Sequence, residues 1–408
     1  MMRAEASHVD CLVRLPSNLI LAQRPLSTAV LYSVVASFPL FFAGGFAVRL
    51  QDDLSISKSQ FGISVSAYFI TSAVGSFTIG SLIDKFGARA GFLIASTGGG
   101  VAAILVAVSN SFGLFAFALA VAGVSNTSGQ LAGNRVLAGL GSNRQGLGFG
   151  VKQAAVPLGS FLAGAVVGTF GAEIDWRSAF LVYSMFAFLC AALAPDGPGK
   201  ASAAEPRRPV GQDWPCLLAL ALAGSLGGAA GNGLAVLTVD AFAESGYSES
   251  ASAIALAVGS GLTIVARTSI GWVAGRRQGS GFVELGSAKA LGAVGFGLMA
   301  VTQDVPVLLW SALILAFLGA WGWPGVMYYT VIRNTTTTPG TATGFVVTGV
   351  FMGGIAGAPL LASIAERWSY NTAWTTASLM GIVATSMVVL ASRLSLVDRH
   401  PAMTTSLA

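Results

Sequence analysis

Few charged side chains lie in the apolar stretches of this chain, and one of them could bind an anion. Arg267 precedes Arg276 by nine residues, which corresponds to about 13 Å of helix and places it near the middle of a membrane-spanning helix. Such an arginine costs at least about 2.5–3.5 kcal/mol, and residues 250–283 contain no Asp or Glu that could offset it. Arg267 therefore either faces a hydrated cavity, where it would attract a carboxylate, or binds backbone carbonyls, or extends towards the inner interface.

Amide side chains accompany a second cation. Lys152 lies about one turn inside another apolar stretch, with Gln153 beside it, and it could contact a solute or extend to the interface. Asn126, Gln130 and Asn134 are four residues apart, a spacing that puts them on one helix face. This polar face predicts either the lining of a cavity or hydrogen bonds to neighbouring helices.

A glycine-rich run and a group of aromatic residues mark further candidate substrate contacts. Asn232 lies in the run GGAAGNG at 227–233, which predicts close helix packing or a broken helix near a site. Trp321, Trp323 and Tyr328 could form an aromatic wall beside a solute. Packing, or anchoring at the membrane interface, is the interpretation that we favour for these three residues.

Proton coupling would need a titratable group whose exposure alternates, and the sequence offers few. Both histidines, His8 and His400, lie near the ends of the chain. Asp240, near the outer end of an apolar stretch, is the best candidate. Facilitated diffusion and anion exchange are equally open.

Other chemistries are not indicated by the sequence. It contains no P-loop, no His/Cys/Asp cluster with the spacing of metal ligands and no nucleophile motif. We therefore expect no enzyme activity, no cofactor and no metal. The net charge of +5 does not indicate nucleic acid, because the places of the basic residues matter more than their sum.

The composition requires a membrane environment for these side chains. The 408 residues are 54% hydrophobic and only 10% charged, whereas soluble domains carry about 25% charged residues. Apolar runs near 20 residues recur, each long enough to cross a hydrocarbon core as a helix. The predicted fold is an all-α membrane protein with twelve spans, at 28–48, 60–82, 91–109, 112–134, 148–170, 177–194, 215–238, 251–274, 286–303, 305–330, 343–364 and 371–392.

The basic residues predict the orientation of these spans. Most of the 22 lysines and arginines fall on one side, and Lys289 is counted there, whereas Arg49, Lys58, Arg177 and Arg367 fall on the other. By the positive-inside rule, this distribution predicts a multi-pass protein of the inner membrane with both termini in the cytoplasm.

The spans divide the chain into five predicted segments. The connector at 195–213, PDGPGKASAAEPRRPVGQD, has the composition of a linker, and the first 26 residues contain no apolar core of a cleaved signal peptide. The prediction is a cytoplasmic tail, a six-helix bundle, a cytoplasmic linker, a second six-helix bundle and a second tail, at 1–26, 27–194, 195–213, 214–392 and 393–408.

The two bundles repeat each other in sequence. GSLIDKFGARA at 80–90 and GWVAGRRQGSG at 271–281 both follow the second span of their half. The stretches at 148–167 and 344–363 both form the fifth span, at a similar offset. This repetition predicts two like halves related by an axis along the membrane normal, with a substrate site between them near mid-membrane.

The loop after the second span resembles a motif of the major facilitator superfamily, roughly G-x-L-x-D-R/K-x-G-R-R/K. Ala88 departs from it at one basic position, and the second copy has Gly275 in place of the acid. The resemblance covers nearly the whole chain, and it implies two pseudo-symmetric six-helix bundles and transport by alternating access. The matching residues are Gly80, Leu82, Asp84, Lys85, Gly87 and Arg89.

This loop is predicted to act as a conformational latch. Asp84 and Lys85 end a helix at the inner interface, where a carboxylate could bind a neighbouring helix N-terminus or an arginine such as Arg135. Such contacts would form in one conformation and break in the other. The alternative is that the loop only shapes a tight turn. The predicted latch consists of Gly80, Asp84, Lys85, Gly87, Arg89 and Arg135.

These observations predict a secondary active or facilitative carrier for a small, anionic organic solute, with uptake slightly favoured over efflux. A drug or metabolite exporter is an alternative, since Pro157 and Gly159 match part of an exchanger motif, although Val156 replaces its glycine. A sensor of the same fold that no longer transports is another. The expected partners are the solute, the lipid bilayer and, if transport is coupled, protons, and we expect a monomer.

Overall fold

The fold is a bundle of long helices in two groups. The computed structural model describes residues 17–138, 142–170, 173–195, 211–277, 279–337 and 339–395, and within these ranges all regular structure is helical. The first group, the N half, consists of α1 (Ser17–Gly45), α2 (Ala47–Leu54), α3 (Lys58–Phe86), α4 (Ala88–Ala107), α5 (Phe112–Ala138), α6 (Ser142–Phe170) and α7 (Trp176–Ala192).

The second group, the C half, has the same plan with one span broken. A short 3-10 turn at Gly211–Asp213 leads into the first helix. The helices are α8 (Trp214–Glu244), α9 (Glu249–Arg277), α10 (Phe282–Val301), α11 (Pro306–Ala320), α12 (Pro324–Asn334), α13 (Pro339–Arg367) and α14 (Tyr370–Leu394). The pair α11 and α12 together forms one predicted span, which residues 321–323 interrupt.

Each predicted span falls on helical structure. Within the described residues, ten stretches have the length and apolar composition of membrane-spanning helices. The other two predicted spans fall on α3 and on α7, which is apolar and 17 residues long. The protein is thus an all-α, multi-pass membrane protein, while the count of twelve spans stays a prediction.

Local sequence signals explain several helix ends. Ser57 and Gln60 form a reciprocal capping box at the start of α3, and the Asp175 carboxylate accepts hydrogen bonds from the first turn of α7. Gly87 joins α3 to α4 with φ of 85°, a conformation that favours glycine. That glycine allows a tight turn between two long antiparallel helices.

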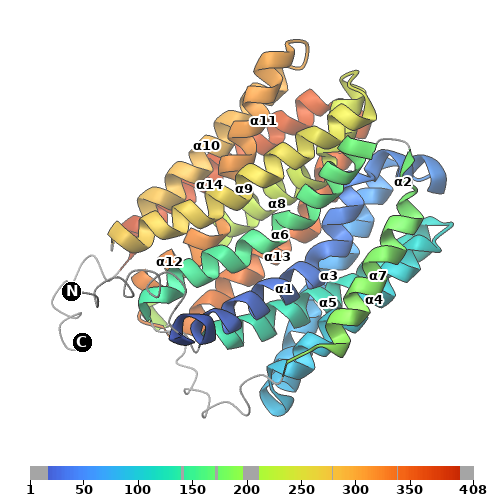
Figure 1. Cartoon of the computed structure of the whole chain (residues 1–408). Coiled ribbons are helices and arrows are strands. Elements are labelled where there is room, and N and C mark those ends of the chain that lie inside the picture. Colours follow the sequence, from blue (N-terminus) through green and yellow to red (C-terminus); the bar gives the residue numbers. More distant parts are fainter. Residues whose placement is uncertain are drawn as a thin grey trace, which may run out of the picture.

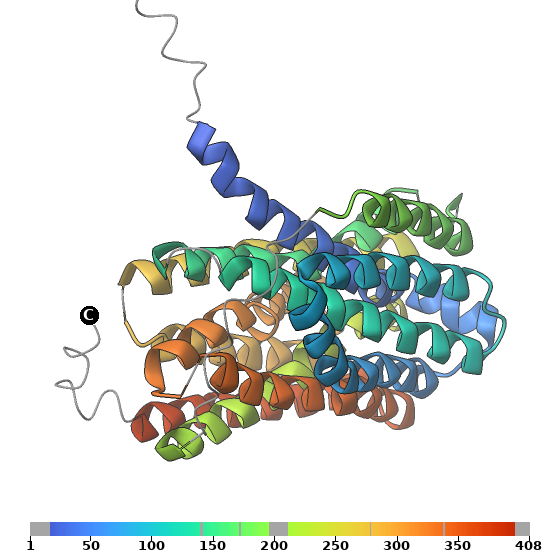
Figure 2. The ribbon, with the colours of Figure 1, turned by 90° about the horizontal axis from the view of Figure 1, so that it is seen from below.

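The two halves lie side by side with all long helices roughly along one axis (Figure 1). We call the end of the bundle at which α1 begins the inner end, following the predicted orientation. The first part of α1 projects away from the bundle (Figure 2). α1 begins at Ser17, within the predicted tail. The rest of the predicted N-terminal tail, most of the linker and all but three residues of the C-terminal tail lie outside the described residues.

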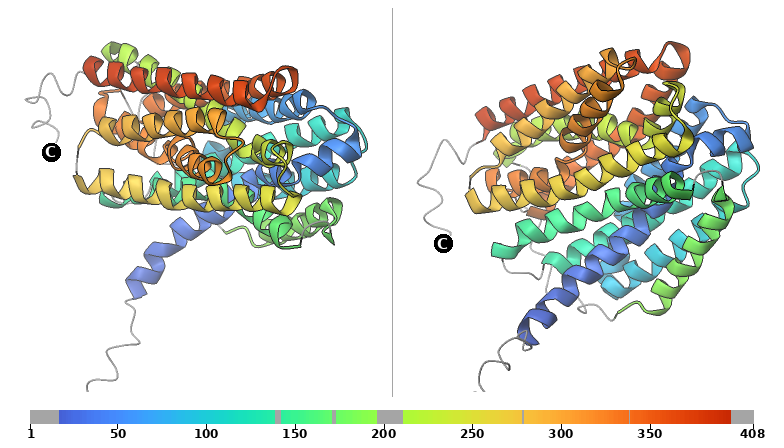
Figure 3. Two further views of the ribbon diagram at one scale, coloured as in Figure 1. Left: turned by 90° about the horizontal axis from the view of Figure 1, so that it is seen from above. Right: turned by 45° about the horizontal axis from the view of Figure 1, so that its top comes forward.

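Two helix pairs form most of the contact between the halves. α6 packs along α9, and α3 packs against α13, while α1 touches α8 and α6 touches α12. Both views of Figure 3 show the yellow α9 beside the teal-green α6. Glycine permits the closest approach, since a Cβ on Gly62 of α3 would lie 2.6 Å from the Pro359 Cα of α13. The interface is therefore built from the second and fifth predicted spans of each half.

Candidate functional site

Arg267 lies at the contact between the halves. Its side chain is buried, with 3% of the residue exposed. Nε donates to the Trp321 carbonyl at 2.9 Å and Nη1 donates to the Gln153 carbonyl at 2.6 Å. The guanidinium also lies 5.1 Å from the centre of the Trp321 ring. Arg267 thus joins α9 to the broken span of its own half and to α6 of the N half, and its role in substrate binding stays a prediction.

Proline explains why one of the two carbonyls that Arg267 contacts is free. Pro157 lies four residues after Gln153 and has no N–H, so the Gln153 carbonyl lacks its helical donor. Pro324 stands in the same relation to Ala320, whose carbonyl accepts from the Trp323 indole N–H at 2.8 Å. Freed carbonyls in a membrane helix must find other donors, and here Arg267 and Trp323 supply them.

The same arrangement occurs at two further prolines. Four residues before Pro39, the Val35 carbonyl accepts from the Tyr183 hydroxyl at 2.5 Å. Four residues before Pro359, the Ile355 carbonyl accepts from Ser66 Oγ at 2.6 Å. The bonds from Ser66 and Arg267 cross between the halves, each from the second predicted span of one half to the fifth of the other.

Lys152 is buried within the N half, with 2% of the residue exposed. Its Nζ donates to Gln130 Oε1 and Asn134 Oδ1, both at 2.6 Å, and to the Gln130 carbonyl at 3.2 Å. Asn134 is exposed and Gln130 is half-buried. The structure therefore brings together the predicted cation and two members of the predicted polar face on α5.

The remaining amides of the predicted set have separate surroundings. Asn126 is buried and donates to Ser72 Oγ of α3 at 3.3 Å. The side chain of Gln153 interacts with that of Tyr328, which lies near Arg267. Asn126 thus makes the interhelical hydrogen bond that was one of the two interpretations, while cavity lining by these residues stays a prediction.

The glycine-rich run around Asn232 packs closely and does not break its helix. α8 continues from Trp214 to Glu244, and a Cβ on Gly231 would lie 2.6 Å from the Ala320 carbonyl oxygen. Asn232 itself is half-buried. Of the two alternatives predicted for this run, close packing is observed, and a helix break occurs instead at residues 321–323, between α11 and α12.

The aromatic residues of the broken span are mostly enclosed. Trp321 and Trp323 are 3% and 2% exposed, and Tyr328 is half-buried. The Trp321 ring lies 5.4 Å from the ring of Phe41 in α1, across the contact between the halves. Packing therefore accounts for both tryptophans in this conformation.

Lys289 was missed by the sequence analysis as a site residue. The charge count assigns it to the inner side, but the structure buries it within α10, with 2% exposed. Its Nζ lies 3.2 Å from the centre of the Trp323 ring and, within the described part of the chain, has no hydrogen-bond partner. The signal was available, because Lys289 lies inside the predicted span 286–303 rather than before it.

The three buried cations share an absence of acidic partners. In the part of the chain that the structure describes, Arg267 and Lys152 donate to carbonyl and amide oxygens, and Lys289 has no acceptor. Buried charges in proteins are normally paired. The interior of the bundle thus holds cationic side chains that no carboxylate of the described residues contacts.

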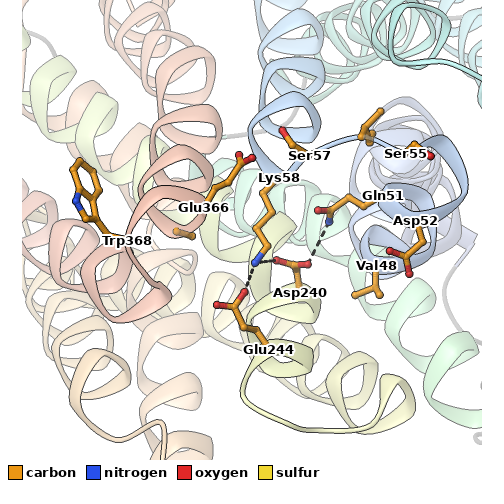
Figure 4. Close-up of a pocket in the computed structure, with 12 residues that line it drawn as sticks. Val48, Gln51, Asp52, Ser55, Ser57, Lys58, Asp240, Glu244, Glu366 and Trp368 are labelled. Atoms are coloured by element: carbon orange, nitrogen blue, oxygen red, sulfur yellow. Dashed lines mark hydrogen bonds and ion pairs between the residues drawn. The ribbon is translucent and has the colours of Figure 1, made fainter.

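The outer end of the bundle has the opposite arrangement. Lys58 at the start of α3 pairs with Asp240, at 3.2 Å, and with Glu244, both in the last turns of α8. Asp240 also accepts from Gln51 at 3.4 Å and from the Tyr370 hydroxyl. We call these five residues the outer charge cluster. Gln51, Lys58, Asp240 and Glu244 line a pocket of about 660 Å³ between the halves (Figure 4).

Two further contacts tie the outer ends of the halves together. Arg49 of α2 pairs with Glu249 at the start of α9, and Ser59 of α3 donates to Glu366 of α13 through its N–H at 3.0 Å and through its hydroxyl. Asp240, the predicted proton-coupling residue, lies within this connected outer end and is 9% exposed. Its role in coupling stays a prediction.

The loop between α3 and α4 is partly described. Gly87 forms the tight turn, and Arg135 Nη1 of α5 donates to the Ile83 carbonyl in the last turn of α3 at 2.9 Å. Lys85 and Arg89 are exposed, and Gly80 is half-buried. The side chain of Asp84 lies outside those described. Arg135 thus contacts the backbone of α3 in this conformation, and the latch stays a prediction.

Comparison with known proteins identifies the protein family of this chain. The model of the Major Facilitator Superfamily matches residues 29–333. The chain belongs to the major facilitator superfamily. It is therefore a transporter and not an enzyme, as its resemblance to that family implied.

A curated relative and two solved structures resemble this superfamily member. The hexuronate transporter of Bacillus subtilis (strain 168) is 25% identical over 149 residues, which are 35% of this chain and 34% of that protein, so the match spans about a third of its length. A D-xylose-proton symporter structure is similar with a TM-score of 0.74 at 13% identity, over 90% of this chain and 97% of its own.

The second structure is a bacterial homologue of the human lysosomal transporter Spinster, in an inward-facing and occupied conformation. It is similar with a TM-score of 0.69 at 14% identity, over 91% of this chain and 97% of its own. At these identities the two structures show that the fold is shared.

Proposed function

We propose that this superfamily member carries a small organic anion, of the sugar-acid class, across the inner membrane by alternating access. The observation that carries the proposal is a set of three buried cations that contact no carboxylate among the described residues, Arg267, Lys152 and Lys289. An ionisable residue within a membrane span normally serves a substrate or an ion pathway. The partial match to a hexuronate transporter supports the same class of solute.

The position of the cations supports a site between the halves. Arg267 contacts α6 of the N half, and the broken span α11–α12 lies beside it. Interrupted helices in transporters commonly mark the substrate site near mid-membrane. An anion entering this region would gain charge pairing that the described residues do not provide. Its binding would favour the state in which the cations face the solute.

The polar contacts at the outer end support access to the solute site from the inner side in this conformation. Lys58, Arg49 and Ser59 each join the N half to an acidic residue of the C half at the outer end. A carrier held closed at that end exchanges solute with the inner side. Uptake would then require these contacts to open before each solute enters, with both termini in the cytoplasm as the basic residues predict.

Transport into proteoliposomes tests the proposal. The purified protein should take up radiolabelled glucuronate, and unlabelled galacturonate should compete while glucose should not, since glucose lacks the carboxylate. Empty liposomes provide the control. Equal uptake of glucose and glucuronate, or no uptake or binding of either acid, would contradict the anion assignment. Loading the same vesicles and following release distinguishes a carrier that exports the acid from one that imports it.

A further inference from the structure

We infer that Lys289, held on the face of Trp323 beside Gly227, is the residue that pairs with the carboxylate of the transported solute, an inference that rests on the proposed function. The site differs from the one that the sequence suggested around Arg267. It assigns a binding role to a residue that the charge count placed outside the membrane. The ligand class is a carboxylate on a small polar molecule.

Elimination among the three buried cations leads to Lys289. Arg267 donates to two carbonyls, the first freed by Pro157 and the second at the break after α11. Lys152 donates to three oxygen atoms of Gln130 and Asn134. The ammonium of Lys289 has no hydrogen-bond partner within the described residues. Among the three, it is the cation whose need for an acceptor the described protein leaves unmet.

Gly227 makes room for the ammonium in the first helix of the C half. A Cβ built at Gly227 would lie 1.7 Å from Lys289 Nζ and 3.2 Å from the Trp323 ring. The ammonium therefore occupies the space that a side chain on α8 would fill. A residue larger than glycine at this position is incompatible with the observed position of Nζ.

The path of the side chain points towards the interface between the halves. Lys289 belongs to α10, which packs against α11, α14 and α12. Its ammonium reaches Gly227 on α8 and Trp323 at the start of α12. α8 contacts α1 and α12 contacts α6, both of the N half. Lys289 thus extends from a peripheral helix into the layer of the C half that faces the other half.

Trp323 fixes one side of this site. Its indole N–H donates to the Ala320 carbonyl that Pro324 leaves free, so the ring is oriented by the break in the span. A desolvated cation–π contact stabilises a cation by less than the cost of burying its charge. The ring alone does not offset the burial of an ammonium, and a solute carboxylate would supply the remainder.

Two variants test this assignment without relying on a single change. Lys289→Met removes the charge and retains the length and apolar stem, and Gly227→Ala leaves the lysine in place but forces its flexible tip out of the gap. Ligand affinity is measured on detergent-purified full-length protein with glucuronate, and with glucose as the neutral control probe. Both variants should bind glucuronate at least about 30-fold more weakly, because losing one partner of a buried charge pair costs about 2 kcal/mol or more.

Thermal unfolding without ligand separates a binding role from a structural one. Lys289→Met should unfold at the same or a higher temperature than the parent, because it removes a buried charge that has no acceptor. Lys152→Met is the matched comparison and should unfold at a lower temperature, since it leaves Gln130 and Asn134 without their donor. If Lys289→Met does not fold, Gly227→Ala decides the question, because its clash is with the mobile end of a side chain.

The outcomes distinguish this inference from the proposed function. Parental glucuronate affinity in a folded Lys289→Met or Gly227→Ala protein overturns the assignment of Lys289 and leaves the anion carrier intact. A parent protein that binds neither glucuronate nor galacturonate removes both together. Loss of stability in Lys289→Met, with unchanged glucuronate affinity, would show a structural lysine.

Discussion

The outer end and the interior of this transporter both hold basic residues at or near the contact between the halves, but the partners of these residues differ. At the outer end, Lys58 and Arg49 pair with Asp240, Glu244 and Glu249 from the other half. In the interior, Arg267 meets backbone carbonyls and Lys289 meets an aromatic ring.

The difference in partners corresponds to a difference in what each region must do during transport. Ion pairs near water can separate at little cost, since water replaces the partner and the net contribution of an exposed pair is about 0–1 kcal/mol. A buried cation without a carboxylate has no such replacement. The outer end is therefore suited to opening and closing, and the interior is suited to holding an anion that arrives from outside the protein.

The largest effect should come from the interior bond network. Arg267→Met leaves the Gln153 and Trp321 carbonyls without donors at a cost of about 1–3 kcal/mol each, and transport should fall roughly 100-fold because the two halves are no longer held in register. Adding Pro157→Ala returns a backbone N–H to the Gln153 carbonyl. We expect the double variant to recover part of the lost stability, measured by thermal unfolding at equal membrane abundance.

Two results would contradict the prediction for Arg267→Met and its rescue by Pro157→Ala. Strictly additive losses in the double variant would mean that the carbonyl freed by Pro157 does not depend on Arg267. Full transport by Arg267→Met, for every acid that the parent carries, would show that neither the network nor a direct contact of Arg267 with the solute matters.

A charge reversal at the outer end should change access more than stability. Lys58→Glu places a carboxylate against Asp240 and Glu244, so the outer ends should separate and a cysteine introduced at Ser66 should react faster with an impermeant thiol reagent added from outside. The rate of thiol modification is the measurement, with the Ser66→Cys single variant as control.

The reversal can be restored within the same cluster. Lys58→Glu combined with Glu244→Lys re-forms an opposite-charge pair between the halves, and the modification rate should return towards that of the control. An unchanged rate in Lys58→Glu would show that these ion pairs do not keep the outer end closed. A high rate in both would mean that Asp240 alone determines the contact.

Asp240, a member of the outer charge cluster, is the residue predicted to couple transport to protons. We expect Asp240→Asn to lose glucuronate accumulation driven by an inward proton gradient, while exchange of labelled for unlabelled glucuronate continues in the same vesicles, because exchange needs no net proton movement. Glu244→Gln, a neighbour in the same cluster, serves as the matched control and should retain accumulation. Undiminished gradient-driven accumulation in Asp240→Asn would exclude it as the coupling residue.

The smallest effect is expected at the second bond between the halves. Ser66→Ala removes one hydrogen bond to the Ile355 carbonyl and should cost about 1 kcal/mol, since the carbonyl is left free by Pro359. Pro359→Ala in the same protein should offset most of this loss by restoring a helical donor. Thermal unfolding of the two single variants and the double variant measures the effect, and an unaltered melting temperature in Ser66→Ala would contradict it.

The fold was largely predictable because hydropathy is a local property. Each predicted span falls on a helix, and the loop with Gly87 forms the turn expected from its motif. The break in the tenth predicted span was not predicted there, although Pro324 and Gly322 mark it in the sequence. A broken helix was instead one of the two alternatives predicted for the run around Asn232, where glycine permits close packing, the other alternative.

The site was less predictable because its contacts join distant helices. Pro157 identifies the Gln153 carbonyl as free from sequence alone, but only the packing of α6 against α9 brings Arg267 to it. Lys289 lies close enough to a span end that charge counting treats it as an interfacial residue. The outer ion pairs join residues at helix ends, and no local sequence pattern predicts that Lys58 pairs with Glu244.

The carbonyls freed by proline have a consequence for how this sequence can diverge. A backbone oxygen is supplied by any amino acid, so positions 35, 153, 320 and 355 can vary without losing the acceptor. The prolines and their donors, Tyr183, Arg267, Trp323 and Ser66, cannot vary independently in the same way. Among homologues, each proline and its donor should be lost or retained as a pair. Covariation of these two positions in an alignment would then identify the helix contacts even where the acceptor residues have changed.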